Sequence, residues 1–175
     1  MVTGLVFDLP HGRWMDDVLR LRSLNEPVRL QFPIEITVVG SSGLGWFAEG
    51  QAKSNLMRRV GEVARGFAPF SFQFDKVVRF PDSGVYYFAP HDASHFHDFQ
   101  LRLADCELRF EPAAFSYVPH CTIAVLARDP SSEAHAEVLA CPVPADDIRV
   151  SSVSFWSVDR SKQEARRGEC ISFGS

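Results

Sequence analysis

Two side chains that could handle a phosphate lie two residues apart in one predicted strand. Residues 117–126 are rich in β-branched and apolar side chains and are followed by a polar Arg-Asp-Pro stop, so we expect a β-strand. Because strand side chains alternate between two faces, His120 and Thr122 should share one face. An imidazole exchanges a proton near neutral pH, and a hydroxyl can hydrogen-bond the same anion. A single pair of this kind is more often structural than functional.

A second predicted strand repeats this arrangement. Residues 32–40 also begin beside a proline and end in a glycine-rich turn, and their alternation places Glu35 and Thr37 on one face. Glu35 lies 85 residues before His120, and Thr37 lies 85 residues before Thr122. Each threonine is followed by an aliphatic residue. The equal spacing strengthens the hypothesis that both polar pairs serve one site.

These motifs resemble the two-histidine phosphoesterase superfamily, the 2′-5′ RNA ligase and cyclic phosphodiesterase proteins, whose two strands each carry His-x-Thr-hydrophobic. The second motif of this chain matches the pattern, whereas Glu35 stands where the family has the first His. The resemblance implies cleavage of 2′,3′-cyclic or 2′-5′ phosphodiesters without a metal or other cofactor. It also implies that His120 and Glu35 are the catalytic residues and that Thr37 and Thr122 bind the phosphate.

Glu35 changes the expected electrostatics of such a site. An ionised carboxylate repels a phosphate that a protonated histidine would attract, and each unit-charge interaction is about 4 kcal/mol at roughly 4 Å and an effective dielectric near 20. The site therefore requires a protonated Glu35, a nearby cation, or a carboxylate turned out of the cleft. Candidate cations are Arg29, Lys53, Arg128 and Arg166. The alternative is a solvated Glu35 near a strand end.

Three functions fit these residues. The first is a phosphodiesterase for cyclic or 2′-5′-linked nucleotides or RNA ends, weakened or altered by Glu35, which could act as a base when ionised or as an acid if its pKa were raised. The second is a catalytically inactive family member that binds a nucleotide, an RNA end or a protein partner in the same cleft. The third is a hydrolase for another substrate that uses the Glu35–His120 pair. A fold alone does not choose among them.

The order of predicted elements indicates an architectural repeat. Residues 32–89 and 118–173 each contain a motif strand, a helix, a long strand, a turn and a strand. With the resemblance, this order predicts an α+β fold in which two pseudo-symmetric lobes of antiparallel sheet, flanked by helices, face a central cleft within a single domain of residues 1–175. The patterns predict helices at about 14–25, 56–67, 94–104 and 132–140, further strands at 4–9, 70–80, 85–88, 148–158 and 170–173, a bulge near 151–152, and a charged hairpin loop at 159–169.

Composition narrows the classes of partner and compartment. The chain has 175 residues, 46% of them hydrophobic, and 15 Phe, which is enough for one well-buried domain. A net charge of −4 without a basic run argues against a long nucleic acid, whereas a small nucleotide or an RNA end remains a suitable partner.

Four cysteines without metal-ligand spacing, no signal peptide and no membrane-spanning run favour the reducing cytoplasm. The histidines at 91, 95 and 97 could chelate zinc, but a solvated helix start is the favoured interpretation. The sequence does not indicate an oligomeric state.

Overall fold

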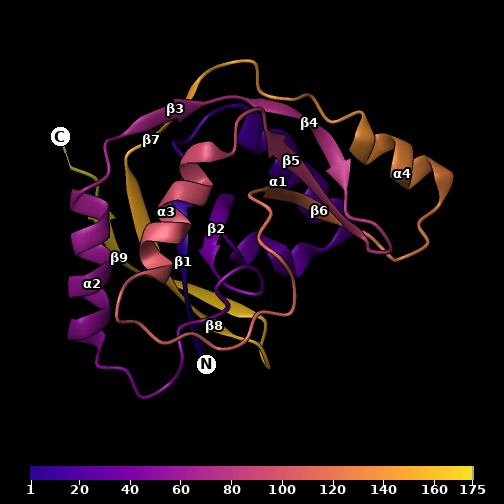
Figure 1. The fold of residues 1–175 in the computed structure, drawn as a ribbon. Coiled ribbons are helices and arrows are strands. Elements are labelled where there is room, and N and C mark those ends of the chain that lie inside the picture. Colours follow the sequence, from indigo (N-terminus) through magenta and orange to yellow (C-terminus); the bar gives the residue numbers. More distant parts are fainter. Residues whose placement is uncertain (175) are drawn as a thin grey trace.

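The computed structural model describes residues 1–174 as a chain of alternating strands and helices (Figure 1). The strands and helices, in chain order, are β1 (Val2–Asp8), α1 (Trp14–Asn25), the 3-10 helix η1 (Pro27–Gln31), β2 (Glu35–Val39), α2 (Lys53–Arg65), β3 (Phe70–Phe72), β4 (Phe74–Arg79), β5 (Val85–Pro90), α3 (Ser94–Ala104), β6 (Cys121–Val125), α4 (Ser132–Leu139), β7 (Ile148–Val150), β8 (Ser152–Asp159) and β9 (Glu164–Ser172).

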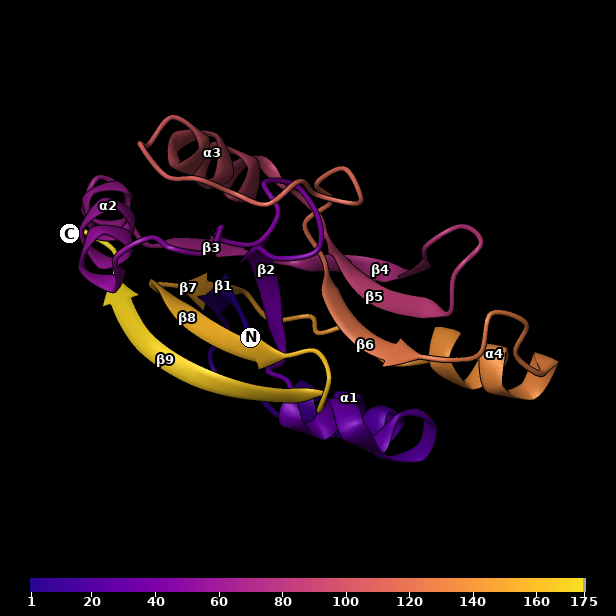
Figure 2. The same cartoon turned by 90° about the horizontal axis from the view of Figure 1, so that it is seen from below.

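The strands form two main sheets and one short connecting pair. One sheet has the order β2-β1-β8-β9, the other has the order β4-β5-β6, and β3 pairs with β7 between them. Neighbouring strands in all three are antiparallel. The predicted α+β fold with two antiparallel lobes is therefore confirmed, and Figure 2 shows the two sheets with β2 and β6 at the centre of the view.

The predicted order of elements is confirmed, with each long strand divided in two: residues 32–89 contain β2, α2, β3, β4 and β5, and residues 118–173 contain β6, α4, β7, β8 and β9. A second division of the chain agrees better with the pairing of the strands. Elements β1 to β4 and β5 to β8 share the order strand, helix, strand, helix, strand, strand, and β9 follows as an addition. This division fits the pairing, because each motif strand pairs with the strand before it: β2 with β1, and β6 with β5. The two halves also exchange their last strands, since β8 pairs with β1 and β4 pairs with β5.

Each exchange takes place at a break in a long predicted strand. The predicted strand of residues 70–80 divides at Gln73 into β3 and β4, and that of residues 148–158 divides at Ser151 into β7 and β8. The shift in apolar phase near Ser151, interpreted above as a bulge, marks the point where the chain passes from the short β3–β7 pair into the large sheet.

Helices pack against each sheet and leave the motif side chains on the other face. In the first sheet, Phe7 of β1 is fully buried and its ring meets Phe96 and Phe99 of α3 at centroid distances of 5.1 and 5.2 Å. Helix α2 contacts β9 in the same sheet, while α1 contacts β6 and α4 contacts β4 in the other (Figure 2). Alternation along β2 buries Ile36 and leaves Glu35 partly exposed on the opposite face.

The predicted charged loop of residues 159–169 was partly wrong. Strand β9 begins at Glu164, so the turn after β8 is short. Most residues of β9 from Arg166 to Cys170 are exposed, because β9 is the outer strand of its sheet and hydrogen-bonds β8 on one side. An edge strand with little buried surface lacks the apolar alternation on which the prediction depended.

The loop after β2 requires glycine at Gly45. Its φ is +84°, and a Cβ there would lie 1.8 Å from the Glu111 carbonyl oxygen. We expect Gly45→Ala to lower the free energy of unfolding by more than about 2 kcal/mol, because backbone must move in addition to the roughly 1–2 kcal/mol cost of a left-handed non-glycine residue. Gly50→Ala is the matched control, since Gly50 has φ +77° but a Cβ there meets nothing closer than 3.9 Å. Equal losses for both variants in urea titrations would contradict this interpretation.

Candidate active site

The two motif strands bring their polar side chains to one cavity. Strand β2 is an edge of the first sheet, β6 is an edge of the second, and the two strands contact one another. A cavity of about 220 Å³ between them is lined by Glu35, Thr37, His120 and Thr122. Side chains that are far apart in the sequence thus face the same space.

His120 is held in one tautomer by a main-chain carbonyl. It lies just before the first residue of β6, because the segment from Tyr117 to His120 includes Pro119 and does not join the sheet. Its Nδ1 is 2.6 Å from the Val118 carbonyl oxygen, and a carbonyl can only accept, so Nδ1 carries the hydrogen. Burial lowers the pKa of His120, so the neutral ring with an Nε2 lone pair is favoured at pH 7.

Glu35 lies where its carboxyl group is poorly solvated. Its Oε1 accepts a 2.9 Å hydrogen bond from the Thr37 hydroxyl, while its Oε2 is buried without a partner in the described part of the chain. Burial raises the pKa of Glu35 to about 7, although the Thr37 hydroxyl and the charge of Arg22 oppose the rise. Asp8, which pairs with Glu35 across strands β1 and β2, adds repulsion in the same direction as burial. Glu35 is therefore largely a neutral acid below pH 7.

Among the four predicted cations, Arg29 lines the cavity with Glu35. Its Nε also donates to the Glu26 carboxylate at 2.6 Å, so part of its charge is already paired. None of the other three candidate cations lines the cavity. Lys53 pairs with Glu169, and an Arg166 Nη2–Glu164 Oε2 separation of 3.6 Å marks a local pair on β9. Sequence spacing does not show which partner a surface charge meets.

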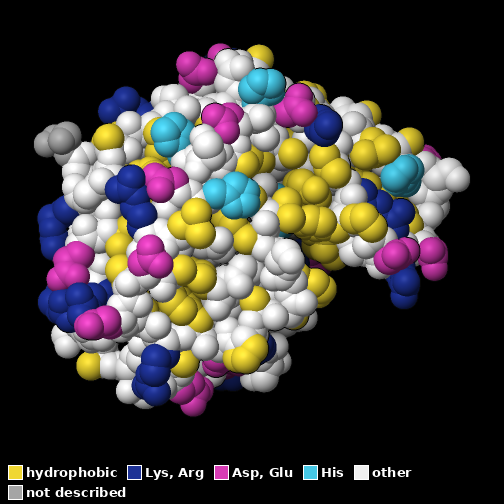
Figure 3. Space-filling view, in the orientation of Figure 1, with side chains coloured by type: hydrophobic (Ala, Val, Ile, Leu, Met, Phe, Trp, Pro, Cys, Tyr) yellow, Lys and Arg dark blue, Asp and Glu magenta, His cyan; other side chains and the backbone are white. Residues whose placement is uncertain are grey.

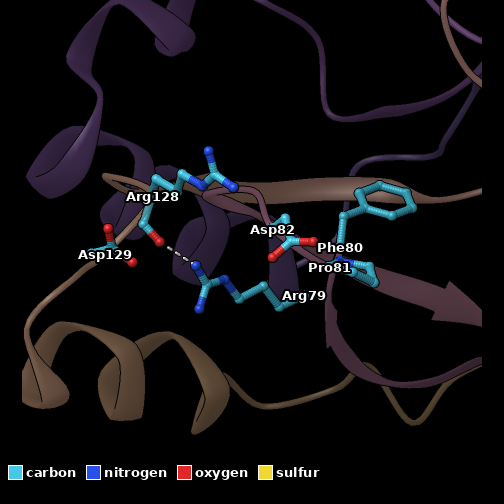
Figure 4. Close-up of a pocket in the computed structure, with 6 residues that line it drawn as sticks. All are labelled: Arg79, Phe80, Pro81, Asp82, Arg128 and Asp129. Atoms are coloured by element: carbon cyan, nitrogen blue, oxygen red, sulfur yellow. Dashed lines mark hydrogen bonds between the residues drawn. The ribbon is translucent and has the colours of Figure 1, made fainter.

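Arg128 lies beside a separate depression of about 230 Å³ (Figure 4). There the Arg79 guanidinium donates to the Arg128 carbonyl oxygen, and Asp82 and Asp129 supply two carboxylates. The depression also includes Phe80 and Pro81 of the β4–β5 hairpin, and neither motif strand contributes to it. Arg128 does not line the cavity that contains Glu35, so it is not placed to neutralise this carboxyl group.

Sequence reasoning missed the most buried cation of the cavity. Arg22 of α1 is 2% exposed and lines the cavity together with Glu35 and Thr122. Its position offered one signal, because Arg22 follows Val18 by four residues and so lies on the apolar stripe of the helix. A charged residue on a buried stripe needs a polar partner inside the protein.

Aromatic side chains extend the cavity in two directions. Trp46 and Trp156 line the cavity itself, and the Trp156 Nε1 is buried without a hydrogen-bond partner in residues 1–174. An adjoining depression of about 380 Å³ shares His120 and Thr122 with the cavity. Its walls include Phe80, Val118 and Phe115, which is 70% exposed, and Figure 3 shows hydrophobic side chains gathered over β5 and β6. Aromatic residues of this kind were interpreted from the sequence as core material.

The loop after β2 supplies two further polar residues to the cleft. Ser41 and Ser42 line both the cavity and the adjoining depression. The sequence indicated only a glycine-rich turn here, and the structure places this loop beside His120. Within residues 1–174, no three His, Cys, Asp or Glu side chains form a group that could hold a metal ion. No helix in the same range is long and apolar enough to cross a bilayer.

The two-lobed α+β fold, with paired motif strands at one cavity, defines the class of the two-histidine phosphoesterases. The sequence model of the 2′-5′ RNA ligase superfamily matches residues 24–162, and the chain belongs to this superfamily. A search of curated protein sequences found no match.

Solved structures of similar fold cover almost the whole chain. E. coli LigT complexed with 3′-AMP is 13% identical over 99% of this chain and 98% of its own, with a TM-score of 0.60. TT0787 of Thermus thermophilus is 14% identical over all of both chains, with a TM-score of 0.63. A structure described as a phosphoesterase is 12% identical over 99% and 98%, with a TM-score of 0.61. At these identities the similarity shows the fold.

The raised pKa of Glu35 predicts a pH-dependent stability. Between the ordinary value of 4.5 and the folded value of about 7, the folded protein binds more protons than the unfolded chain, so stability falls as pH rises. The loss is complete above pH 7 and amounts to at most about 3.4 kcal/mol. Because glutamine stays neutral, we expect Glu35→Gln to raise the melting temperature at pH 8 much more than at pH 4.5.

The exposed Glu62 provides the control for this measurement, since hydrogen bonds from Arg58 lower its pKa. Glu62→Gln should not stabilise the protein at pH 8. A change in melting temperature for Glu35→Gln that is the same at both pH values would show that the Glu35 carboxyl titrates normally.

Proposed function

We propose that this protein cleaves 2′,3′-cyclic or 2′-5′-linked ribonucleotide phosphodiesters without a metal ion. Membership of the 2′-5′ RNA ligase superfamily supports a phosphoesterase or RNA ligase-like function. The observation that carries the finer proposal is the pairing of a neutral acid, Glu35, with a neutral base, His120, at one cavity. The four motif residues then have complementary roles at one phosphorus atom.

In the proposed reaction, His120 Nε2 removes a proton from a water molecule or a hydroxyl group, and that oxygen attacks phosphorus. The proton on Glu35 passes to the leaving oxygen as the P–O bond breaks. The reaction leaves an imidazolium and a carboxylate, and proton exchange with solvent restores both groups. Thr122 is suited to donate a hydrogen bond to a non-bridging oxygen. Thr37 donates to Glu35 Oε1 and so helps to fix the orientation of the carboxyl group.

This assignment resolves the electrostatic objection raised by the sequence. A protonated Glu35 does not repel the phosphate, and Arg22 and Arg29 give the cavity positive charge. Of the two proton roles left open by the sequence, the acid role fits a carboxyl group with a pKa of about 7. Below pH 7 this group is mostly protonated, and the lowered pKa of His120 leaves the imidazole neutral in the upper part of that range.

A nucleotide or an RNA end is the proposed partner. LigT, which shares the fold, has been crystallised with 3′-AMP, ATP and NADP+. The aromatic residues Trp46, Trp156 and Phe115 could stack on bases, as aromatic side chains commonly do in RNA recognition. The cytoplasm remains the expected location, because the cysteines of the described chain are free thiols.

A catalytically inactive protein that binds a nucleotide, an RNA end or a protein partner is the second candidate. The hydrogen bond from Thr37 to Glu35 favours it, because this hydroxyl is engaged by the protein and not free for a phosphate oxygen. Under this alternative, Glu35→His should gain cyclic phosphodiesterase activity, and Glu35→Ala should bind inorganic phosphate more tightly.

Removal of the proposed base should abolish most turnover. In the presence of EDTA, with the four 2′,3′-cyclic nucleotides and 2′-5′ dinucleotides as substrates, we expect His120→Ala to lower kcat on the order of 10² to 10⁴-fold. The melting temperature should change little, because His120 lies outside the apolar core cluster. His91→Ala is the control, since His91 is exposed before α3. Normal kcat with a sharply lowered melting temperature would make His120 a structural residue.

The pH profile should identify the role of Glu35. As an acid with a pKa of about 7, it predicts a rate that falls above pH 7, whereas a base would make the rate fall as Glu35 protonates in acid. Protonation of His120 should cause a separate fall at lower pH. Glu35→Gln should retain phosphate binding, lose turnover and lose the decline above pH 7. A rate that keeps rising through pH 8 would contradict the acid role.

A further inference from the structure

Arg22 makes an unusual set of hydrogen bonds for a buried guanidinium. Its Nη1 donates to the carbonyl oxygens of Phe32 at 2.9 Å, Pro33 at 3.1 Å and Arg29 at 3.4 Å. Its Nη2 donates to the Thr122 carbonyl oxygen at 2.6 Å. All of these acceptors are main-chain atoms.

These bonds join the two motif strands. Phe32 and Pro33 lead into β2, which begins at Glu35, whereas Thr122 lies in β6. The two strands belong to different sheets, and no ladder of main-chain hydrogen bonds connects those sheets directly in residues 1–174. The guanidinium therefore bridges the gap and helps to set the distance between the motifs. The Tyr117 hydroxyl, which donates to the Thr37 carbonyl oxygen at 3.0 Å, is a second, uncharged tie.

The charge of Arg22 lacks a counter-ion. No carboxylate in the described residues lies within 4.0 Å of its nitrogens, and its Nε is buried without any partner. An arginine remains protonated at any ordinary pH, so the positive charge persists beside the cavity. Glu35 is neutral for most of the range below pH 7, and Arg29 is paired with Glu26. A buried charge with only dipolar partners is favourable for an incoming anion.

We propose that Arg22 is the positioning residue of this cleft: it ties the start of β2 to β6 through their carbonyl groups and supplies the fixed positive charge for a bound phosphate. The proposal rests on the proposed function of the cavity as a phosphodiester site. It adds a residue outside both motifs, contributed by α1, on which the spacing and the charge of the site both depend.

Native protein provides the first test, which needs no substitution. The ¹⁵N–¹H signals of the arginine Nε groups are followed during titration with inorganic phosphate at pH 6. The Arg22 signal should shift with phosphate, because its Nε–H has no protein partner, while the signal of exposed Arg20 should not. An unmoved Arg22 signal, or no phosphate binding by the native protein, overturns the charge role.

Two substitutions separate charge from geometry. Arg22→Gln removes the charge, so we expect the dissociation constant for inorganic phosphate to rise on the order of tenfold. The pKa of Glu35, followed by ¹³C NMR of its carboxyl carbon, should rise by about one unit. Arg22→Lys keeps the charge but cannot reach all the carbonyls, so phosphate affinity should change little while kcat falls on the order of 10²-fold. Native kcat in Arg22→Lys overturns the positioning role.

Two further variants serve as controls. Arg20→Gln removes an exposed charge of the same helix that pairs with Glu137, and it should leave all three measurements unchanged. Tyr117→Phe removes the uncharged tie and should leave phosphate affinity and the Glu35 pKa as they are. If Arg22→Gln leaves the phosphate affinity and the Glu35 pKa unchanged, Arg22 is a structural residue only. If no substrate is cleaved but both quantities depend on Arg22, the proposed function and the positioning role fail together, and the charge role of Arg22 stands.

Discussion

The antiparallel pairing of β3 with β7 is the constraint on which the two-lobed arrangement depends. Each of these short strands continues, after one residue, into a strand that joins the sheet of the other half of the chain. Neither large sheet can therefore be completed by one half alone, since β8 completes the sheet of β1 and β4 completes that of β5. This exchange supports the proposal that residues 1–175 form a single domain, and it brings the edge strands β2 and β6 together.

The chemistry of the cleft follows from this meeting of two sheet edges. A side chain at the edge of one sheet is covered by the neighbouring sheet, so water is excluded from Glu35 more than from a carboxyl group on a free edge. Exclusion of water raises the pKa of this carboxyl and lowers that of His120, and the two shifts both favour the neutral form. The exclusion of water thus favours a proton donor in the first motif, Glu35, and a proton acceptor in the second, His120.

Helices and motif strands could be predicted from the sequence because their patterns are local. The limits of α1 and α3 follow from apolar stripes that pack on the core, and alternation assigned Glu35 and Thr37 to one face of β2. The exchange of β4 and β8 could not be predicted, because side-chain alternation shows that a strand is half-buried but not which strand it pairs with. Arg22 and the two cavity tryptophans were missed for a related reason. The sequence around one residue on an apolar stripe, or around one aromatic residue, is similar whether that residue lies in the core or in a cavity wall. Local sequence therefore does not distinguish the two locations.

The exposed charged side chains of β9, which made this strand hard to recognise in the sequence, also affect how two copies of the protein can associate. An outer strand offers unpaired N–H and C=O groups, to which a strand of another molecule can add. On β9 these groups lie among exposed charged side chains, with Arg166 and Arg167 followed by Glu169. A second copy approaching this edge would have to strip water from several charged groups and bring like charges together. The outer rim of the larger sheet is thereby protected against strand-by-strand aggregation.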